Sequence, residues 1–231
     1  MAGNILLIET STALCSTALV SDGAVVEYRE SAEPRAHASM TAVFVKEMLD
    51  SRGITLSDCD AVCVSKGPGS YTGLRVGVST AKGLCFGAKK PLMAVGTLDI
   101  LVAQATDEGL VPEGCRFIVP MVDARRMEVY SAVFTPDGKQ LTETEPCIVD
   151  SSSFAGYLEQ GPVLFIGDGA AKCEPVLNHP NACFAQCSPK ASAMIRPALE
   201  AYNEKRFENT AYFEPFYLKQ FVATVSAKKL F

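Results

Sequence analysis

A glycine-rich block in the first third of the chain constrains its fold more than any other feature. Residues 66–75 read KGPGSYTGLR and follow a short apolar run at 61–65. The apolar run predicts a buried strand. The proline-free stretch after the block, rich in small residues, is long enough for about four turns of helix. The glycines therefore stand where a strand passes into the N-terminus of a helix.

Two interpretations of these glycines remain open at this stage. Unpaired N–H groups and the dipole at a helix N-terminus favour an anion, which would predict phosphate binding. However, Leu74 and Arg75 follow Gly73, where a P-loop would place Lys and then Ser or Thr. The alternative is that Gly67, Gly69 and Gly73 allow a tight turn and close packing.

The helix after the block is unusual because it contains four glycines. Each interior glycine costs roughly 1 kcal/mol relative to alanine, so their presence predicts that another backbone approaches closely. We expect Leu74, Val78, Ala81 and Cys85 to face the core. The small face could then pack on this chain's own sheet or, as we favour, receive a helix from another chain.

A helix predicted at 34–52 is also apolar on several sides. Met40, Phe44 and Met48 form one apolar row, and a second row of small and branched residues runs beside it. An outer helix of a monomer would show a broader polar face. We therefore expect this helix, too, to contact more than its own sheet.

Composition excludes several classes of protein. The chain has 231 residues, 48% of them hydrophobic, which is typical of a well-packed globular protein. A net charge of −5 argues against this chain alone gripping a nucleic-acid backbone. No signal peptide and no apolar run of about 20 residues are evident, so we expect a cytoplasmic location and no membrane span.

The cysteines predict neither a disulfide framework nor a metal site. Nine cysteines are scattered through the expected strands and helices, as is typical of reduced, buried thiols. The pairs Cys59/Cys63 and Cys183/Cys187 lack the tight turns of structural zinc sites, and the two histidines, His37 among them, have no ligand-spaced neighbour.

The order of predicted elements indicates two lobes. Residues 1–107 read β-β-β-α-β-α-β-α, the order of a ribonuclease-H-like lobe. A smaller second lobe, 108–231, repeats the opening: an apolar strand with Asp123 at its tip, a second strand and a glycine turn. The chain is thus predicted to be an α/β protein.

Two lobes that each open with an acid-tipped strand fit an actin/hexokinase-like arrangement, with a nucleotide in the cleft between them. On that template Glu9 and Asp123 are the paired acids, and the neighbouring hydroxyls and glycines line the phosphates and the adenosine. The alternative is that these groups simply face solvent, and residue types do not separate the two. The candidate cleft residues are Glu9, Thr10, Ser11, Gly67, Gly69, Asp123, Gly167 and Gly169.

Several motifs together resemble those of the TsaB (YeaZ) family. They are ILLIETS at 5–11, His37 at the start of the first helix, the glycine block with AKGL at 81–84, the DAR and EVY segments at 123–130, and PFYL at 215–218. The resemblance is dense over residues 1–130. It implies two ribonuclease-H-like lobes of the actin/hexokinase-like ATPase superfamily.

The resemblance also implies a subunit without catalysis or cofactor of its own. Its partner would be a TsaD-like ATPase, which carries nucleotide and metal and transfers threonylcarbamoyl to the adenosine 3′ of the anticodon in tRNA. A TsaE-like ATPase would dock on the pair, and tRNA would be met only through the complex. The apolar faces expected on its helices predict a homodimer when the chain is alone.

The resemblance also implies that the partner binds the helices at 35–52 and 70–88. These are the two helices whose apolar faces, or faces of small residues, are unusual for a monomer. The residues expected there are His37, Met40, Thr41, Phe44, Met48, Val76, Thr80, Gly83, Leu84 and Gly87.

Departures from the catalytic relatives weigh against activity. Those relatives bind metal through two histidines four residues apart, whereas His37 is followed at that spacing by Thr41, and Glu9 replaces the Asp usual at the first strand tip. The alternative function is an ATP-dependent phosphotransferase that uses Glu9 and Asp123. A peptidase would need an activated nucleophile or a metal-bound water, which two separated histidines do not supply.

Overall fold

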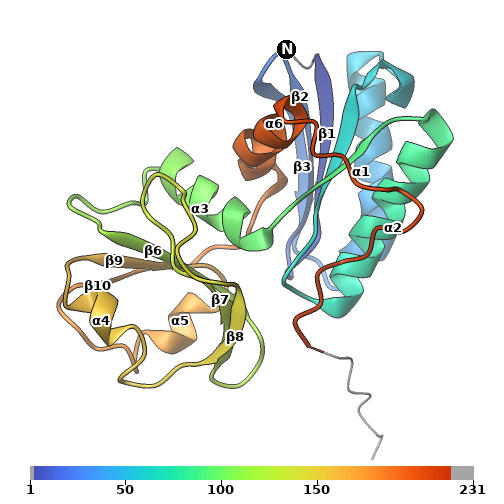
Figure 1. The fold of residues 1–231 in the computed structure, drawn as a ribbon. Helices are drawn as coiled ribbons and strands as arrows, with labels where there is room; N and C mark the ends of the chain where they lie inside the picture. The colour runs from blue at the N-terminus through green and yellow to red at the C-terminus, as the bar shows by residue number, and fades with distance from the viewer. Residues whose placement is uncertain (1–2, 220–231) are drawn as a thin grey trace, which may run out of the picture.

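The first lobe is a five-stranded sheet with helices on both faces. The computed structural model describes residues 3–219 (Figure 1). The first-lobe elements are β1 (Asn4–Glu9), β2 (Cys15–Ser21), β3 (Ala24–Ser31), α1 (Ala36–Arg52), the short helix η1 (Leu56–Asp58), β4 (Ala61–Ser65), α2 (Tyr71–Ala88), β5 (Leu92–Val95) and α3 (Thr97–Asp107).

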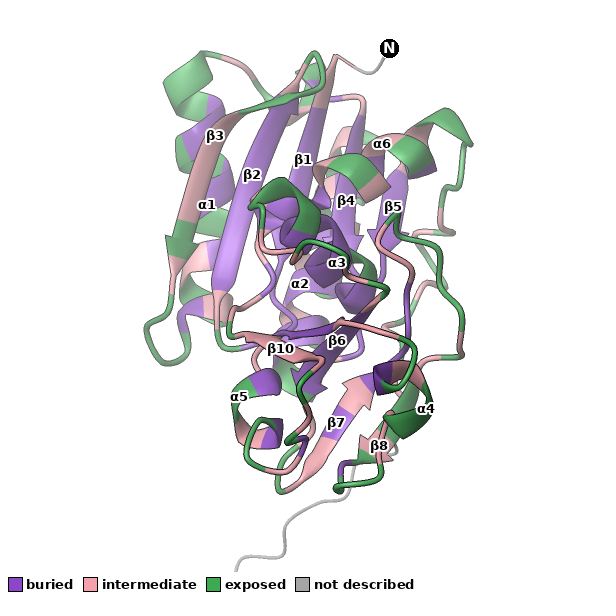
Figure 2. Cartoon of the chain, turned by 90° about the vertical axis from the view of Figure 1, so that its left-hand side faces the viewer, coloured by how far each residue is buried: buried purple, intermediate pink, exposed green. Residues whose placement is uncertain are grey.

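The strand order of this sheet is β3-β2-β1-β4-β5. β2 runs antiparallel to both β1 and β3, whereas β1, β4 and β5 are parallel. Figure 2 shows that β2, β1, β4 and β5 are buried along most of their length. β3 lies at the edge of the sheet and is more exposed. The predicted ribonuclease-H-like lobe is confirmed.

The second lobe repeats this topology with shorter helices. Its elements are β6 (Phe117–Asp123), β7 (Glu128–Ser131), β8 (Glu145–Ile148), α4 (Ala155–Leu158), β9 (Val163–Ile166), α5 (Ala170–Cys173) and β10 (Ala182–Ala185), followed by η2 (Ala191–Met194) and α6 (Ile195–Asn203). The strand order β8-β7-β6-β9-β10 reproduces that of the first sheet, with β6 in the place of β1. α4 and α5 have only four residues each.

The C-terminal part of the chain returns to the first lobe, which corrects the predicted extent of the second lobe, 108–231. Met194, Ala198 and Ala201 pack with Ile5 and Leu7 on the face of the first sheet that α1 and α2 leave free. The second sheet itself ends at β10, and residues 220–231 lie outside the described chain. The first lobe is therefore built from two separate stretches of sequence.

The segment after α6 runs along the first lobe beside α2 (Figure 1). The N–H of Glu208 donates to the Leu92 carbonyl, and the N–H of Phe216 donates to the Lys66 carbonyl. The Lys82 ammonium on α2 donates to the Phe213 carbonyl at 2.9 Å. These backbone contacts hold residues 208–216, which we call the C-terminal strap, against β5 and α2.

The glycines at the start of α2 allow the loop after β1 to approach the helix backbone. A Cβ on Gly73 would lie 2.1 Å from the Thr10 carbonyl oxygen, and a Cβ on Gly77 would lie 2.2 Å from Thr10 Oγ1. No Cβ fits at such distances, so the sequence requires glycine at both positions. By contrast, a Cβ on Gly83 would meet nothing within 4 Å.

This difference predicts opposite effects for the same substitution on one helix. Gly73→Ala should lower the free energy of unfolding by about 3 kcal/mol, because α2 must move away from the β1 loop. Gly83→Ala should raise it by about 0.5–1 kcal/mol, because alanine is the better helix former in open space. Denaturant unfolding of both variants tests the pair. Equal effects at the two positions would contradict the packing account.

Candidate functional site

Glu9, at the tip of β1, is buried rather than open to a cleft. The side chain is 0% exposed, and its Oε1 accepts the N–H of Ser11 at 2.5 Å. Its Oε2 has no hydrogen-bond partner within residues 3–219. Burial raises the pKa of Glu9 to about 7, and the negative charge of Asp168 adds to this rise. Hydrogen bonds from Ser11 and Ser65 act in the opposite direction and lower the pKa. Burial therefore favours the protonated form of this carboxyl group well above the pH at which a solvated glutamate ionises.

The hydroxyl residues after Glu9 are also buried. Thr10 Oγ1 donates to the Gly73 carbonyl at 2.8 Å, and the Ser11 carbonyl accepts the N–H of Ser70 at 2.7 Å. Thr10 and Ser11 are both 0% exposed. The expectation that Glu9, Thr10 and Ser11 line an open cleft is therefore wrong for this structure, because the α2 glycines let the loop sink against the helix.

Gly67 and Gly69 serve the same close packing. Gly67 has φ +107°, and a Cβ there would lie 2.9 Å from the Phe216 carbonyl oxygen. A Cβ on Gly69 would lie 2.3 Å from the Ser11 carbonyl oxygen. Gly67 is buried and Gly69 is half-buried. Of the two interpretations left open by the sequence, the geometry supports packing over an anion site.

The tip of β6 in the second lobe carries a compact polar cluster. Asp123 Oδ1 accepts from the Lys172 ammonium at 2.6 Å, and the Asp123 N–H donates to Asp168 Oδ1 at 2.9 Å. The turn glycines fit closely beside it: a Cβ on Gly167 would lie 2.3 Å from the Met121 carbonyl oxygen, and one on Gly169 would lie 2.9 Å from the Val129 side chain.

Asp168 is the second-lobe acid whose charge acts on Glu9, and the sequence analysis missed it. Burial raises the pKa of Asp168, and the nearby Asp123 adds to that rise. Asp123, predicted to pair with Glu9, is instead held by Lys172. The position of Asp168 between two glycines directly after β9 was the available signal, because it copies the strand-then-glycine layout of the first lobe.

Among residues 3–219, no three His, Cys, Asp or Glu side chains are placed to hold a metal ion. The nine cysteines are free thiols. In the same part of the chain, no helix combines the length and apolar character required to cross a membrane.

Three residues predicted at the partner surface lie inside this chain instead. Thr41, Phe44 and Met48 are buried, and Met48 belongs to the core between α1 and the first sheet. Phe44 packs against Cys15, and Thr41 Oγ1 donates to the His37 carbonyl at 2.6 Å. The apolar row of α1 faces its own sheet, so these residues cannot contact a partner.

The remaining predicted residues lie at or near the surface. His37, Met40, Val76, Thr80 and Leu84 are half-buried. His37 Nε2 is 2.8 Å from the Thr12 carbonyl oxygen, a contact that fixes the ring at the start of α1.

The outer face of α2 is open at its C-terminal half. Gly83 and Gly87 are exposed, and a Cβ on either would meet nothing within 4 Å. The expectation that Leu74, Val78, Ala81 and Cys85 face the core is confirmed.

Phe86 is the main surface residue that the sequence analysis missed. Its ring is 84% exposed on α2, beside Gly83 and Gly87. On the neighbouring helix α1, Val43 is 42% exposed. We call the outer faces of these two helices the helix-pair surface, defined by Ala38, Ala42, Val43, Val76, Thr80, Gly83, Leu84, Phe86 and Gly87.

Two sheets of identical strand order, joined through α3, define the two-lobed fold of the actin/hexokinase-like ATPase class. The inorganic polyphosphate/ATP-glucomannokinase of Arthrobacter sp. strain KM shares this fold, with a TM-score of 0.51 at 12% identity over 87% of this chain and 99% of that one.

Sequence comparison places the chain within that class. TsaB of Escherichia coli K12, a tRNA threonylcarbamoyladenosine biosynthesis protein, is 30% identical over 228 residues, covering 95% of this chain and 96% of the relative. YeaZ from Pseudomonas aeruginosa superposes with a TM-score of 0.82 at 26% identity, over 94% of this chain and 100% of that chain. A family model described as TsaD, tRNA N6-adenosine threonylcarbamoyltransferase, matches residues 30–226. The chain belongs to the TsaB (YeaZ) family, as its motifs predicted.

The buried Glu9 predicts an unusual pH dependence of stability. Its pKa rises from 4.5 in the unfolded chain to about 7 in the folded one, so the folded state keeps a proton that the unfolded state has released. Glu9 should therefore destabilise the fold progressively between those pH values, by about 3 kcal/mol, and no further above pH 7.

Glu9→Gln isolates this contribution. The free energy of unfolding of the variant, minus that of the wild type, should increase between pH 4.5 and 7 and then stay constant. Glu174→Gln, at an exposed position of the second lobe, is the matched control and should show no such trend. A difference independent of pH for Glu9→Gln would show that the carboxyl group titrates normally.

Proposed function

We propose that this chain is a non-catalytic subunit of the machinery that forms threonylcarbamoyladenosine in tRNA, and that it binds a TsaD-like ATPase through the helix-pair surface. Its TsaB relatives are named for this biosynthesis, and the TsaD family model matches most of the chain. The observation that carries the proposal is Phe86, a large aromatic side chain 84% exposed on α2 beside two open glycines.

The helix-pair surface has the features of a helix-docking site. Buried aromatic anchors contribute a large share of binding free energy at protein interfaces, and Phe86 is available as such an anchor. Gly83 and Gly87 present bare backbone, so a partner helix can approach closely on either side of the ring. No described part of this chain covers the Phe86 ring. An uncovered apolar face of this kind also supports homodimer formation when the partner is absent.

The strand tips support a chain without catalysis of its own. Glu9 is buried with a pKa of about 7, and Asp123 is engaged by Lys172. A phosphotransferase that uses Glu9 and Asp123, the alternative function, would need both carboxylates to face one open cleft. We therefore assign nucleotide and metal to the TsaD-like partner and no cofactor to this chain.

The rest of the assembly follows from the same proposal. A TsaE-like ATPase docks on the heterodimer, and tRNA is held through the complex, because a chain with a net charge of −5 offers little attraction to phosphates. The complex works in the cytoplasm.

Gly83→Arg should abolish the heterodimer with the cognate TsaD-like protein while leaving the fold intact. The new side chain enters open space in this chain but would fill the approach of a partner helix. Phe86→Ala should weaken the association by about 2 kcal/mol or more, as loss of an interface anchor does. Size-exclusion chromatography with light scattering, on the mixed proteins, measures both effects.

Gly156→Arg is the matched control, because Gly156 is an exposed, open glycine on α4 of the second lobe. It should associate as the wild type does. The proposal fails if the wild-type proteins do not associate, or if Gly83→Arg and Phe86→Ala bind as the wild type does. ATP hydrolysis by the isolated chain would instead support the phosphotransferase.

A further inference from the structure

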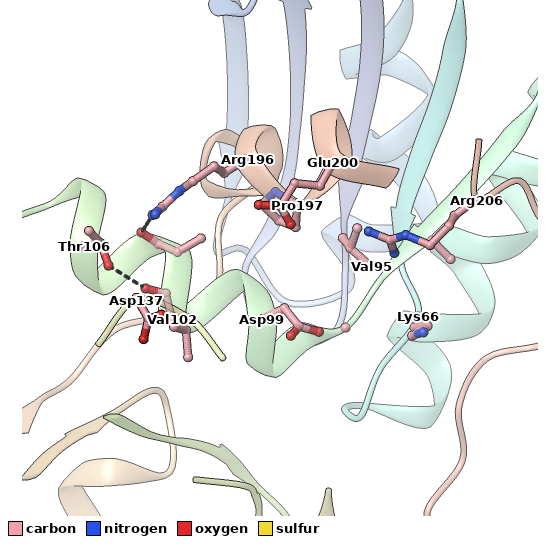
Figure 3. Close-up of a pocket in the computed structure, with 14 residues that line it drawn as sticks. Lys66, Val95, Asp99, Val102, Thr106, Asp137, Arg196, Pro197, Glu200 and Arg206 are labelled. Atoms are coloured by element: carbon pink, nitrogen blue, oxygen red, sulfur yellow. Dashed lines mark hydrogen bonds between the residues drawn. The ribbon is translucent and has the colours of Figure 1, made fainter. Parts of the chain in front are cut away.

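A cavity of about 190 Å³ lies between the lobes, on the α6 side of the first sheet (Figure 3). Its walls come from α3, α6, the carboxyl ends of β4 and β5, and the turn at 137–138 of the second lobe. α1 and α2 pack on the other face of that sheet. The cavity is therefore separate from the helix-pair surface, and neither Glu9 nor Asp123 lines it.

Charged side chains of both signs line this cavity without pairing across it. Figure 3 shows Lys66 and Arg206 toward one end, with Asp99 on α3 and Glu200 on α6 between the two helices. Within residues 3–219, the Lys66 ammonium and the Glu200 carboxylate make no hydrogen bond or ion pair, and Asp99 makes no ion pair. Two of the cations already have partners outside the cavity: Arg196, at the far end, pairs with Asp107 at 2.8 Å, and Arg206 pairs with Glu204 at 2.5 Å.

The backbone holds apart the two charged groups that have no partner in the described chain, those of Lys66 and Glu200. The N–H of Lys66 donates to the Val95 carbonyl at 2.9 Å, and the Lys66 carbonyl accepts the N–H of Phe216 at 2.7 Å. Glu200 is carried by α6, whose Ala198 and Ala201 are buried in the first-lobe core. Because both ends are anchored, a ligand that bridges them would not have to order the protein first, and such preorganisation favours binding.

The size and charge of the cavity define the class of ligand. Its volume equals that of roughly six water molecules, which is below the usual range for drug-sized ligands. Three basic and three acidic side chains line it, so a free phosphate would meet carboxylates as well as cations. A small zwitterion would satisfy both signs. Val102 and Pro197 add an apolar wall for a short side chain.

We propose that this cavity binds a small free α-amino acid. Its carboxylate pairs with Lys66, and its ammonium pairs with Glu200 and Asp99. The open, partly solvated walls indicate an affinity in the millimolar range, as expected for a ligand of few atoms.

Ligand-observed NMR titration of the full-length chain tests this with glycine, L-alanine, L-serine, L-threonine and L-valine. At least one should bind with a millimolar dissociation constant. For the tightest of them, the N-acetyl derivative, which lacks the ammonium, and the primary amide, which lacks the carboxylate, should each bind at least tenfold more weakly.

Lys66→Met and Glu200→Gln should each weaken binding of that amino acid at least tenfold, while Glu174→Gln, outside the cavity, should leave it unchanged. Thermal unfolding of each variant verifies that the fold is retained, as expected for side chains that are not in the core. The inference is overturned if none of the five amino acids binds, if both derivatives bind as tightly as the parent, or if both cavity variants retain wild-type affinity.

Discussion

The close approach of the β1 loop to the N-terminus of α2 is the contact on which the first lobe depends. Because Gly69, Gly73 and Gly77 have no side chains, Ser11 and Thr10 can lie directly against the backbone at the start of the helix. Thr10 Oγ1 donates a hydrogen bond to the Gly73 carbonyl. This contact buries the tip of β1, including Glu9. The second lobe contains a similar close approach on a smaller scale, in which Gly167 lies directly against the Met121 carbonyl.

Burial of this strand tip changes the chemistry of Glu9. An acid that carries a proton near neutral pH, as Glu9 does, is a weak ligand for a cation and a poor partner for a phosphate-bound metal. In the function proposed above, the interaction site lies on the outer faces of α1 and α2 and not at the strand tips. A fold can keep its architecture while different members use different surfaces.

The sequence predicted the order of elements in the first lobe and the core face of α2, because both follow local patterns. Leu74, Val78, Ala81 and Cys85 face the core as their helical spacing required. Prediction failed where several faces of one element were equally apolar: on α1, no pattern distinguished the buried Phe44 row from an outer one. Nor could it show that Phe86 is exposed or that α6 packs on the first sheet, since both depend on contacts between residues far apart in sequence.

The return of α6 to the first sheet has a consequence for synthesis of the chain. The first lobe is interrupted by the whole of the second, so the apolar face formed by Ile5 and Leu7, which Ile100 of α3 covers only in part, is incomplete until α6 emerges from the ribosome. Residues 1–107 cannot complete their lobe while translation continues, although N-terminal domains often fold first. The last quarter of the chain therefore supplies both β10, the final strand of the second sheet, and α6, which completes the first lobe. A protein truncated before α6 would expose core residues of the first lobe.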